Sequence, residues 1–168
     1  MKLSSARNIA ESIVVTLAPH CEPGRCVIAG SIRRGKPEPR DIEVVCIPNL
    51  AAFGLFGDEL VTDPAFVHAV NLWDKVKGEP TGKYTQRIVD GVKLDLFMPS
   101  RNCWGNILAI RTGSARFSHE VLANTWVRLG FKSVEGMLWR DGKPYPCPEE
   151  TDLFKLLGIP WVKPEDRT

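Results

Sequence analysis

Long apolar runs are missing from this sequence of 168 residues. The longest ones, such as residues 13–18, are far shorter than the roughly 20 residues that a membrane helix needs. Arg7 and Glu11 lie where a signal peptide would need its apolar centre. The composition, 43% hydrophobic and 25% charged, is that of a globular chain with a sizeable core. We therefore expect a soluble, intracellular protein, most simply cytoplasmic, that has no membrane partner.

Cysteine and histidine do not occur at the spacing of a metal site. Five cysteines leave one unpaired in any complete disulfide scheme, and Cys46 lies in an apolar run where a thiol behaves as a small hydrophobe. A reducing compartment is the simpler interpretation. Cys21 and Cys26 could be half of a zinc site, but no second pair follows at ligand spacing. The sequence therefore disfavours a structural metal.

The chain also lacks a large excess of charge. A net charge of +2 argues against a protein that coats nucleic acid by bulk electrostatics. The basic residues are nevertheless concentrated in residues 25–40, which contain one acid, Glu38. They are Arg25, Arg33, Arg34, Lys36 and Arg40. Most basic runs are solvated loops, but this one leads directly into a pair of carboxylates, which favours a site for phosphate and metal.

That pair is Asp41 and Glu43, two positions apart in an apolar run. Alternate side chains of a strand share a face, so a strand at residues 41–47 would present both carboxylates together. A third acid, Asp95, shares a predicted strand face with Lys93. Three carboxylates of this kind could hold two Mg²⁺ ions for an in-line displacement at phosphorus.

The predicted scaffold is a mixture of helices and strands. A helix capped by Ser4 or Ser5 is expected to end near residue 18, and a second one to begin at Pro64. Strands are expected at residues 26–30 and 41–47, and a hairpin at residues 84–89 and 92–98 around an Asp-Gly turn. The apolar stretch at residues 53–57 is expected to pack rather than to contact a ligand.

A Gly-Ser pair precedes the acids. Gly30 would let the backbone approach a phosphate, and Ser31 could donate its hydroxyl and main-chain N–H to it.

Taken together, the Gly-Ser pair, the basic residues after it and the acids resemble the palm of the nucleotidyltransferase superfamily, and specifically family X DNA polymerases, the DNA polymerase beta group. The motifs are Gly30-Ser31, residues 33–36, residues 41–43 and residues 92–96. The C-terminal third resembles that family's thumb through residues 112–114, Phe117, 129–131, 137–140, 149–157 and 163–167.

The resemblance covers nearly the whole chain, with residues 49–80 the least matched. It implies an α+β fold: a nucleotidyltransferase palm over residues 1–100, with a mixed sheet and helices on one face, and a small α/β thumb lobe over residues 101–168. Asp41, Glu43 and Asp95 would be the catalytic metal ligands for two Mg²⁺ ions, with Mn²⁺ as a possible substitute. The implied nucleotide contacts are Gly30, Ser31, Arg34, Arg40, Gly113 and Ser114. The implied DNA contacts are Arg33, Lys36, Lys93, Arg111 and Arg116. In the family, the turn at Gly113-Ser114 carries a cis peptide bond.

Three departures from the family pattern stand out. Glu43 replaces an aspartate, and the extra methylene moves the carboxylate by about a bond length. Ile110-Arg111 replaces the aromatic pair before the thumb turn, which makes Arg111 a candidate phosphate ligand. The Gly-Ser motif comes so early that we expect no lyase domain or fingers, but a minimal palm-plus-thumb form similar to reduced viral members. A bacterial, phage or viral origin is expected.

The expected function is templated addition of dNMP to a primer 3′ hydroxyl, by a monomer acting on primer-template or gapped DNA. Because few phosphate contacts fit on this chain, synthesis should be distributive and suited to short gaps, as in repair. One alternative is a template-independent nucleotidyltransferase that acts on RNA, protein or a small molecule. Another is a catalytically silent module that binds duplex ends.

Overall fold

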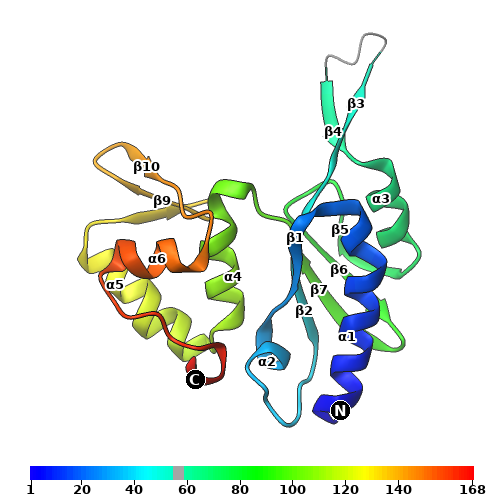
Figure 1. Ribbon diagram of the computed structural model, residues 1–168, viewed down its shortest axis with the longest axis horizontal. Coiled ribbons are helices and arrows are strands. Elements are labelled where there is room, and N and C mark those ends of the chain that lie inside the picture. Colours follow the sequence, from blue (N-terminus) through cyan, green and yellow to red (C-terminus); the bar gives the residue numbers. More distant parts are fainter. Residues whose placement is uncertain (55–58) are drawn as a thin grey trace. The chain divides into compact units, whose positions relative to one another are not determined.

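The computed structural model describes residues 1–54 and 59–168, which divide into two compact units (Figure 1). The first unit comprises residues 1–28 and 37–98, and the second comprises residues 29–36 and 99–168. The chain therefore enters the second unit twice, once for a short segment after residue 28 and once for its C-terminal part. Within the described residues, no helix combines the length and the hydrophobicity that crossing a membrane requires.

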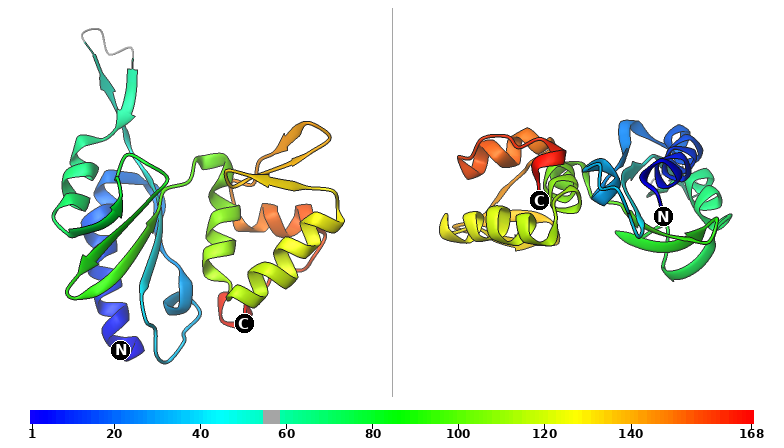
Figure 2. Two further views of the ribbon diagram at one scale, coloured as in Figure 1. Left: turned by 180° about the vertical axis from the view of Figure 1, so that it is seen from behind. Right: turned by 90° about the horizontal axis from the view of Figure 1, so that it is seen from below.

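The first unit contains a five-stranded mixed sheet in the order β1-β2-β7-β6-β5. The β2–β7 pair is parallel and the other three pairs are antiparallel. The strands are β1 (Cys21–Ile28), β2 (Ile42–Pro48), β5 (Asp74–Gly78), β6 (Tyr84–Val89) and β7 (Val92–Phe97). Helices α1 (Leu3–Leu17) and α3 (Pro64–Asn71) cover one face of this sheet, as Figures 1 and 2 show. The expected α+β class with a mixed sheet is confirmed.

Alternation along the strands gives the sheet two different faces. Ile42 and Val44 on β2 and Leu94 and Leu96 on β7 are fully buried. Helix α1 buries Ala6, Ala10, Ile13 and Leu17, whose spacing of three or four residues forms one helical stripe. The residues between the buried strand positions point to the other face, and the predicted acids Glu43 and Asp95 are among them.

The β6–β7 hairpin has the predicted turn. Asp90 and Gly91 both have positive φ, 49° and 74°, which is the backbone of a type I′ turn. The beginning of β1 differs from the prediction, because a bulge between Cys21 and Cys26 lets the strand begin five residues earlier than expected. Gly30 does not end a strand but begins a short helix, α2 (Gly30–Arg33). The predicted cap at Ser4 or Ser5 is wrong, because helix α1 begins at Leu3 and both serines lie inside it. The N-cap residue is Lys2, whose side chain makes no capping hydrogen bond.

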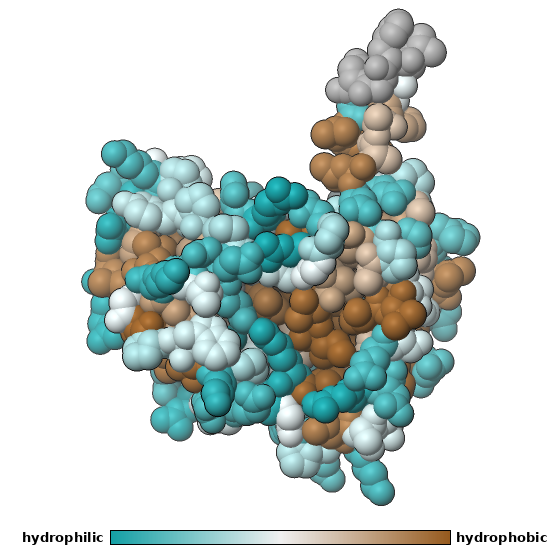
Figure 3. All heavy atoms as spheres, in the orientation of Figure 1, coloured by the Kyte–Doolittle hydropathy of each residue, from teal (hydrophilic) through white to brown (hydrophobic). Residues whose placement is uncertain are grey.

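A two-stranded hairpin of β3 (Leu50–Phe53) and β4 (Glu59–Thr62) extends from the first unit. Leu50, Phe53 and Leu60 are each at least 60% exposed, and the apolar surface of this hairpin is visible in Figure 3. The prediction that residues 53–57 pack is therefore wrong for Phe53, while residues 55–57 lie outside the described part of the chain.

The second unit packs helices against a small antiparallel sheet in the order β10-β9-β8. Its strands are β8 (Lys132–Val134), β9 (Met137–Arg140) and β10 (Lys143–Tyr145). Its longer helices are α4 (Trp104–Thr112), α5 (Asn124–Arg128) and α6 (Glu150–Leu157), and a π-helix, η3 (Phe117–Ala123), precedes α5. Short 3₁₀ turns lie at Ala18–His20 in the first unit and at Arg101–Cys103 and Pro164–Asp166 in the second. The core of the second unit includes Phe117, Leu122, Phe131, Leu153 and Phe154.

Gly105 brings helix α4 close to the segment before α6. Its N–H donates to the Cys147 carbonyl oxygen at 2.8 Å. A Cβ atom at this position would lie 2.0 Å from the carbonyl oxygen of Glu149, closer than any real contact. Only glycine allows the two backbones to approach this closely, so this residue fixes the position of α6 against α4.

Candidate active site

Two of the three predicted acids face each other on neighbouring strands. Glu43 on β2 is the register partner of Asp95 on β7, so both side chains leave the same face of the sheet. Asp41 lies immediately before β2, two residues from Glu43. The first unit therefore brings the three acids to one edge of a parallel strand pair, which agrees with the expected proximity of the two strands.

The ammonium group of Lys93 lies between two of these carboxylates. Its Nζ is 3.6 Å from Asp41 Oδ2 and 3.7 Å from Asp95 Oδ2. Carboxylates about 4 Å apart repel one another by roughly 1 to 4 kcal/mol, depending on the local dielectric. Lys93 offsets this repulsion in the protein without metal.

The second oxygen of Asp95 is held by β6. Tyr84 donates its hydroxyl proton to Asp95 Oδ1 at 2.5 Å, and Gln86 Nε2 donates to the same oxygen at 2.6 Å. Gln86 is the register partner of Asp95, and the Asp95 residue is only 9% exposed. One carboxylate oxygen is thus fixed by two donors, while the other faces Lys93.

Sequence reasoning missed Tyr84 and Gln86, although the signal was present. The Asp-Gly pair fixes a two-residue turn, and this turn fixes the register of the hairpin. Counting outward from the turn places Gln86 opposite Asp95 and Tyr84 opposite Phe97. Strand alternation then puts both side chains on the face of the acids.

The donor set fits a hard divalent cation. Carboxylate oxygens are the ligands that Mg²⁺ and Mn²⁺ prefer, and Asp41 and Asp95 already share one cationic group, the Lys93 ammonium. In their present arrangement, however, the described residues contain no cluster of three acidic, histidine or cysteine side chains that could hold a metal ion. A metal ion would therefore have to displace Lys93 and draw the carboxylates together.

The Gly-Ser motif lies in the second unit, in the segment of residues 29–36. Gly30 has a φ of 61°, a left-handed conformation that glycine adopts without strain. The Ser31 hydroxyl oxygen is buried, and no hydrogen-bond partner for it is found among the described residues. Buried polar groups normally have partners, so this hydroxyl is a candidate donor to a ligand.

A buried ion-pair network holds this segment within the second unit. Glu150 accepts from Arg33 Nη1 and Nη2 at 2.9 and 2.7 Å, and from Arg167 Nη1 at 2.6 Å. Thr112 adds two further contacts, since its hydroxyl accepts from Arg33 Nη1 and its carbonyl oxygen from Arg34 Nη1, both at 2.6 Å. Burial raises the pKa of Glu150, but the hydrogen bonds from Arg33 and Arg167 outweigh it and leave this pKa below its ordinary value.

The turn at Gly113-Ser114 follows helix α4. All peptide bonds of the described residues are trans, so the cis bond that the resemblance implies at this turn is absent. Ser114 Oγ instead accepts from the Phe117 N–H at 3.0 Å, and the Ser114 N–H donates to the Arg167 carbonyl oxygen at 2.9 Å. These two bonds fix the turn at the beginning of the π-helix.

The remaining predicted contacts are basic residues at the surface. Lys36, Arg40 and Arg111 are exposed, and exposed Arg116 forms an ion pair with Glu120 one turn along its helix. Arg33 differs from these, because its guanidinium group already pairs with Glu150 and Thr112. The predicted DNA and nucleotide contacts of these residues stay predictions.

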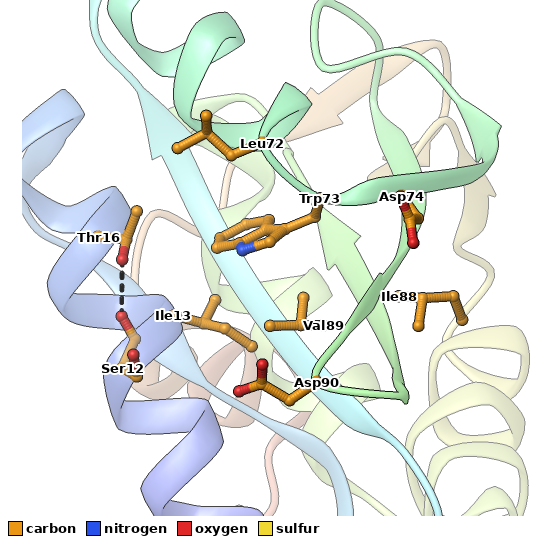
Figure 4. A pocket seen from close by; sticks show the side chains of 9 residues that line it. All are labelled: Ser12, Ile13, Thr16, Leu72, Trp73, Asp74, Ile88, Val89 and Asp90. Atoms are coloured by element: carbon orange, nitrogen blue, oxygen red, sulfur yellow. Dashed lines mark hydrogen bonds between the residues drawn. The ribbon is translucent and has the colours of Figure 1, made fainter.

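A hollow in the first unit is separate from these residues. It has a volume of about 350 Å³ and is lined by α1, by the residues between α3 and β5, and by the end of β6 with its turn (Figure 4). The Trp73 indole extends across it toward Thr16, whose hydroxyl donates to the Ser12 carbonyl oxygen at 2.9 Å. None of the predicted site residues lines this hollow, so it is not part of the candidate site.

In the comparison with known proteins, a family model matches part of the second unit. Residues 107–168 match the family model described as the DNA polymerase beta thumb. DNA polymerase lambda of Rattus norvegicus is 26% identical over an alignment of 184 residues, which covers 94% of this chain. The chain is similar to family X DNA polymerases. It spans 31% of the length of the rat protein, or about a third of that relative.

The family X similarity differs in strength along the chain. The thumb match includes most of α4 and everything after it, as expected from the C-terminal motifs. Residues 1–106, which include the three acids and the Gly-Ser motif, lie outside that match. The roles of the individual site residues in the first unit therefore depend on their geometry.

Proposed function

We propose that this chain is a nucleotidyltransferase of the family X type that adds dNMP to the 3′ hydroxyl of a DNA primer. The register of Glu43 with Asp95, with Asp41 beside them, is the observation that carries this proposal. The thumb match and the similarity to DNA polymerase lambda support it. Residues 1–100 would act as the palm and residues 101–168 as the thumb lobe.

The acids would hold two Mg²⁺ ions, with Mn²⁺ as a substitute. Asp41 and Glu43 would bind both ions and Asp95 one of them, and the bound metal would lower the pKa of the primer hydroxyl and neutralise charge at the α-phosphate. Tyr84 and Gln86 already hold Asp95 Oδ1, so Asp95 Oδ2 is the oxygen left to approach a metal. Lys93 would release this oxygen when a metal binds.

The proposed substrates are a dNTP and primer-template or gapped DNA. Ser31 would donate its unpartnered hydroxyl to a triphosphate oxygen, with Arg34 and Arg40 supplying positive charge and Gly30 close approach. Gly113 and Ser114 would lie near the base or sugar. Lys36, Lys93, Arg111 and Arg116 are the proposed DNA contacts, whereas the buried pairing of Arg33 favours a positioning role.

The proposal includes weak, distributive synthesis in short gaps. Each neutralised phosphate contributes close to one unit to the salt dependence of binding, so a chain with few exposed basic contacts should hold DNA only modestly. A long product made from purified protein within one binding event would contradict this part of the proposal.

The alternative is template-independent transfer to RNA, protein or a small molecule. The observation in its favour is Glu43, because its side chain is longer than the aspartate of the family X pattern.

Incubation with a gapped duplex, Mg²⁺ or Mn²⁺ and one dNTP at a time separates the two functions. We expect extension by the complementary dNTP. Extension by all four dNTPs would favour the alternative, and binding without extension would identify a silent duplex-end module and overturn both.

A further inference from the structure

Three of the five cysteines lie together in the first unit, outside the candidate active site. Cys26 on β1 is directly opposite Cys46 on β2, and Cys21 on β1 is opposite Pro48. Cys46 and Pro48 are two residues apart on β2, so their side chains share one face of the sheet. Their partners, Cys26 and Cys21, therefore share that face with Cys46.

A bulge in β1 creates this arrangement. Residues 22–25 of β1 stand opposite a single residue of β2, Ile47. In a regular strand, five residues of separation would place Cys21 and Cys26 about 16 Å apart and on opposite faces. The bulge brings them to adjacent positions of one face, about 7 Å apart between Cα atoms, near the upper limit for a disulfide. Gly24, with a φ of 73°, supplies the backbone turn that the bulge requires.

The three thiols contact one another and differ in exposure. The Cys21 sulfur accepts hydrogen bonds from the thiols of Cys26 and then Cys46, which lower the pKa of Cys21 well below its ordinary value. Cys21 is 4% exposed and Cys46 is fully buried, whereas Cys26 is partly exposed. A small reagent would therefore reach Cys26 first.

We propose that Cys21 and Cys26 are a reversible oxidation site at which a hydroperoxide forms an intramolecular disulfide. The two sulfurs share one proton, and in the form that carries it on Cys21 the Cys26 thiolate attacks the peroxide. An S–O bond forms as the O–O bond breaks, and the leaving hydroxide takes the proton from Cys21 and becomes water. The Cys21 thiolate then attacks the Cys26 sulfur, so the S–S bond forms and the S–O bond breaks, and the second hydroxide takes a proton from solvent and leaves as water. Two thiols lose two electrons and the peroxide gains them.

Cys46 has a separate part in this reaction. It hydrogen-bonds the Cys21 sulfur from the opposite strand, but it is buried where the oxidant does not reach. We assign it the role of a donor that orients Cys21 toward Cys26. This proposal is independent of the polymerase proposal, because no residue of the candidate active site takes part.

Peptide mapping of the oxidised full-length protein tests the proposal. Trypsin cleaves after Arg25, between the two cysteines, and leaves Cys21, Cys26 and Cys46 on three different peptides. After brief treatment with hydrogen peroxide and alkylation, we expect one disulfide that joins the Cys21 and Cys26 peptides, and its loss on reduction. Five free thiols after treatment, or a disulfide that joins the Cys26 and Cys46 peptides, would overturn the proposal.

Variants separate the roles. Cys21→Ser should abolish the disulfide and leave Cys26 as a sulfenic acid that dimedone traps. Cys46→Val removes the donor but keeps an apolar core residue, and it should slow disulfide formation several-fold without preventing it. Cys103→Ser, at a buried cysteine of the second unit, is the matched control and should change nothing. A normal rate in Cys46→Val would contradict the role of Cys46, and circular dichroism verifies the fold of each variant.

Discussion

The buried ion-pair network joins distant residues of the second unit, and Glu150→Gln tests its contribution to stability. Glu150 is 8% exposed and pairs with Arg167, which is fully buried, and with Arg33, whose side chain is 21% exposed. Removing the acid from a buried pair typically costs 3 to 5 kcal/mol, because the remaining charge is left uncompensated. Exposed pairs contribute at most about 1 kcal/mol, so most of the loss should come from Arg167. We expect a loss of about 3 kcal/mol in the free energy of unfolding.

The pH dependence gives a second measure of the same network. The pKa of Glu150 is lower in the folded protein than its ordinary value, because two guanidinium groups stabilise the carboxylate against the cost of burial. This stabilisation is fully present above the unfolded pKa of about 4.3 and is lost as the pH falls through the lower, folded pKa. The difference between wild type and Glu150→Gln should therefore be largest near pH 7 and shrink below about pH 4.

Urea unfolding at several pH values measures both effects. Glu165→Gln is the matched control, because it removes an exposed carboxylate of the same unit and should leave stability unchanged. If Glu150→Gln unfolded within about 0.5 kcal/mol of wild type, the range of ordinary surface substitutions, the network would not stabilise this unit. A difference that did not depend on pH would show that the loss is one of packing rather than of charge.

Three further predictions concern other contacts. Lys93→Met removes the ammonium group that lies between the two aspartates, so Mn²⁺ should bind several-fold tighter in a titration followed by electron paramagnetic resonance; weaker binding would contradict the competition. Glu43→Asp should raise Mg²⁺-supported incorporation relative to Mn²⁺-supported incorporation, and an unchanged ratio would refute this. Gly105→Ala should destabilise the protein by about 3 kcal/mol or more in thermal unfolding, since its Cβ would clash with a carbonyl oxygen. Gly82→Ala, where the nearest atom is 3.4 Å away, should be close to neutral.

Local sequence patterns predicted those helices and strands whose ends are marked by residues within or next to them. The Asp90-Gly91 turn fixed the β6–β7 hairpin, and Pro64 marked the beginning of α3. Strand alternation also predicted that Asp41 and Glu43 share one face, because this property depends only on neighbouring residues. The beginning of β1 was not predictable in this way, since a Pro-Gly pair indicates the end of an element and here lies inside a bulge.

Contacts between distant residues account for most of the remaining differences. The pairing of Arg33 with Glu150 was not predictable, because the two residues are 117 positions apart and no local pattern connects them. The contacts of Asp95 with Tyr84 and Gln86 lie between these two cases: they join different strands, but the register of the hairpin would have located them. The exposed Phe53 shows that hydrophobicity alone did not predict packing.

Single-turnover incorporation by Asp95→Asn tests the central claim most directly. With a gapped duplex, the complementary dNTP and Mg²⁺, this variant should incorporate at least about 100-fold more slowly than wild type, the scale of losing one electrostatic stabiliser of the transition state. Its circular dichroism and its affinity for the duplex should be unchanged. Asp90→Asn, the same substitution in the turn of the same hairpin, should incorporate at the wild-type rate. Incorporation by Asp95→Asn at a rate near that of wild type would contradict the metal-dependent site.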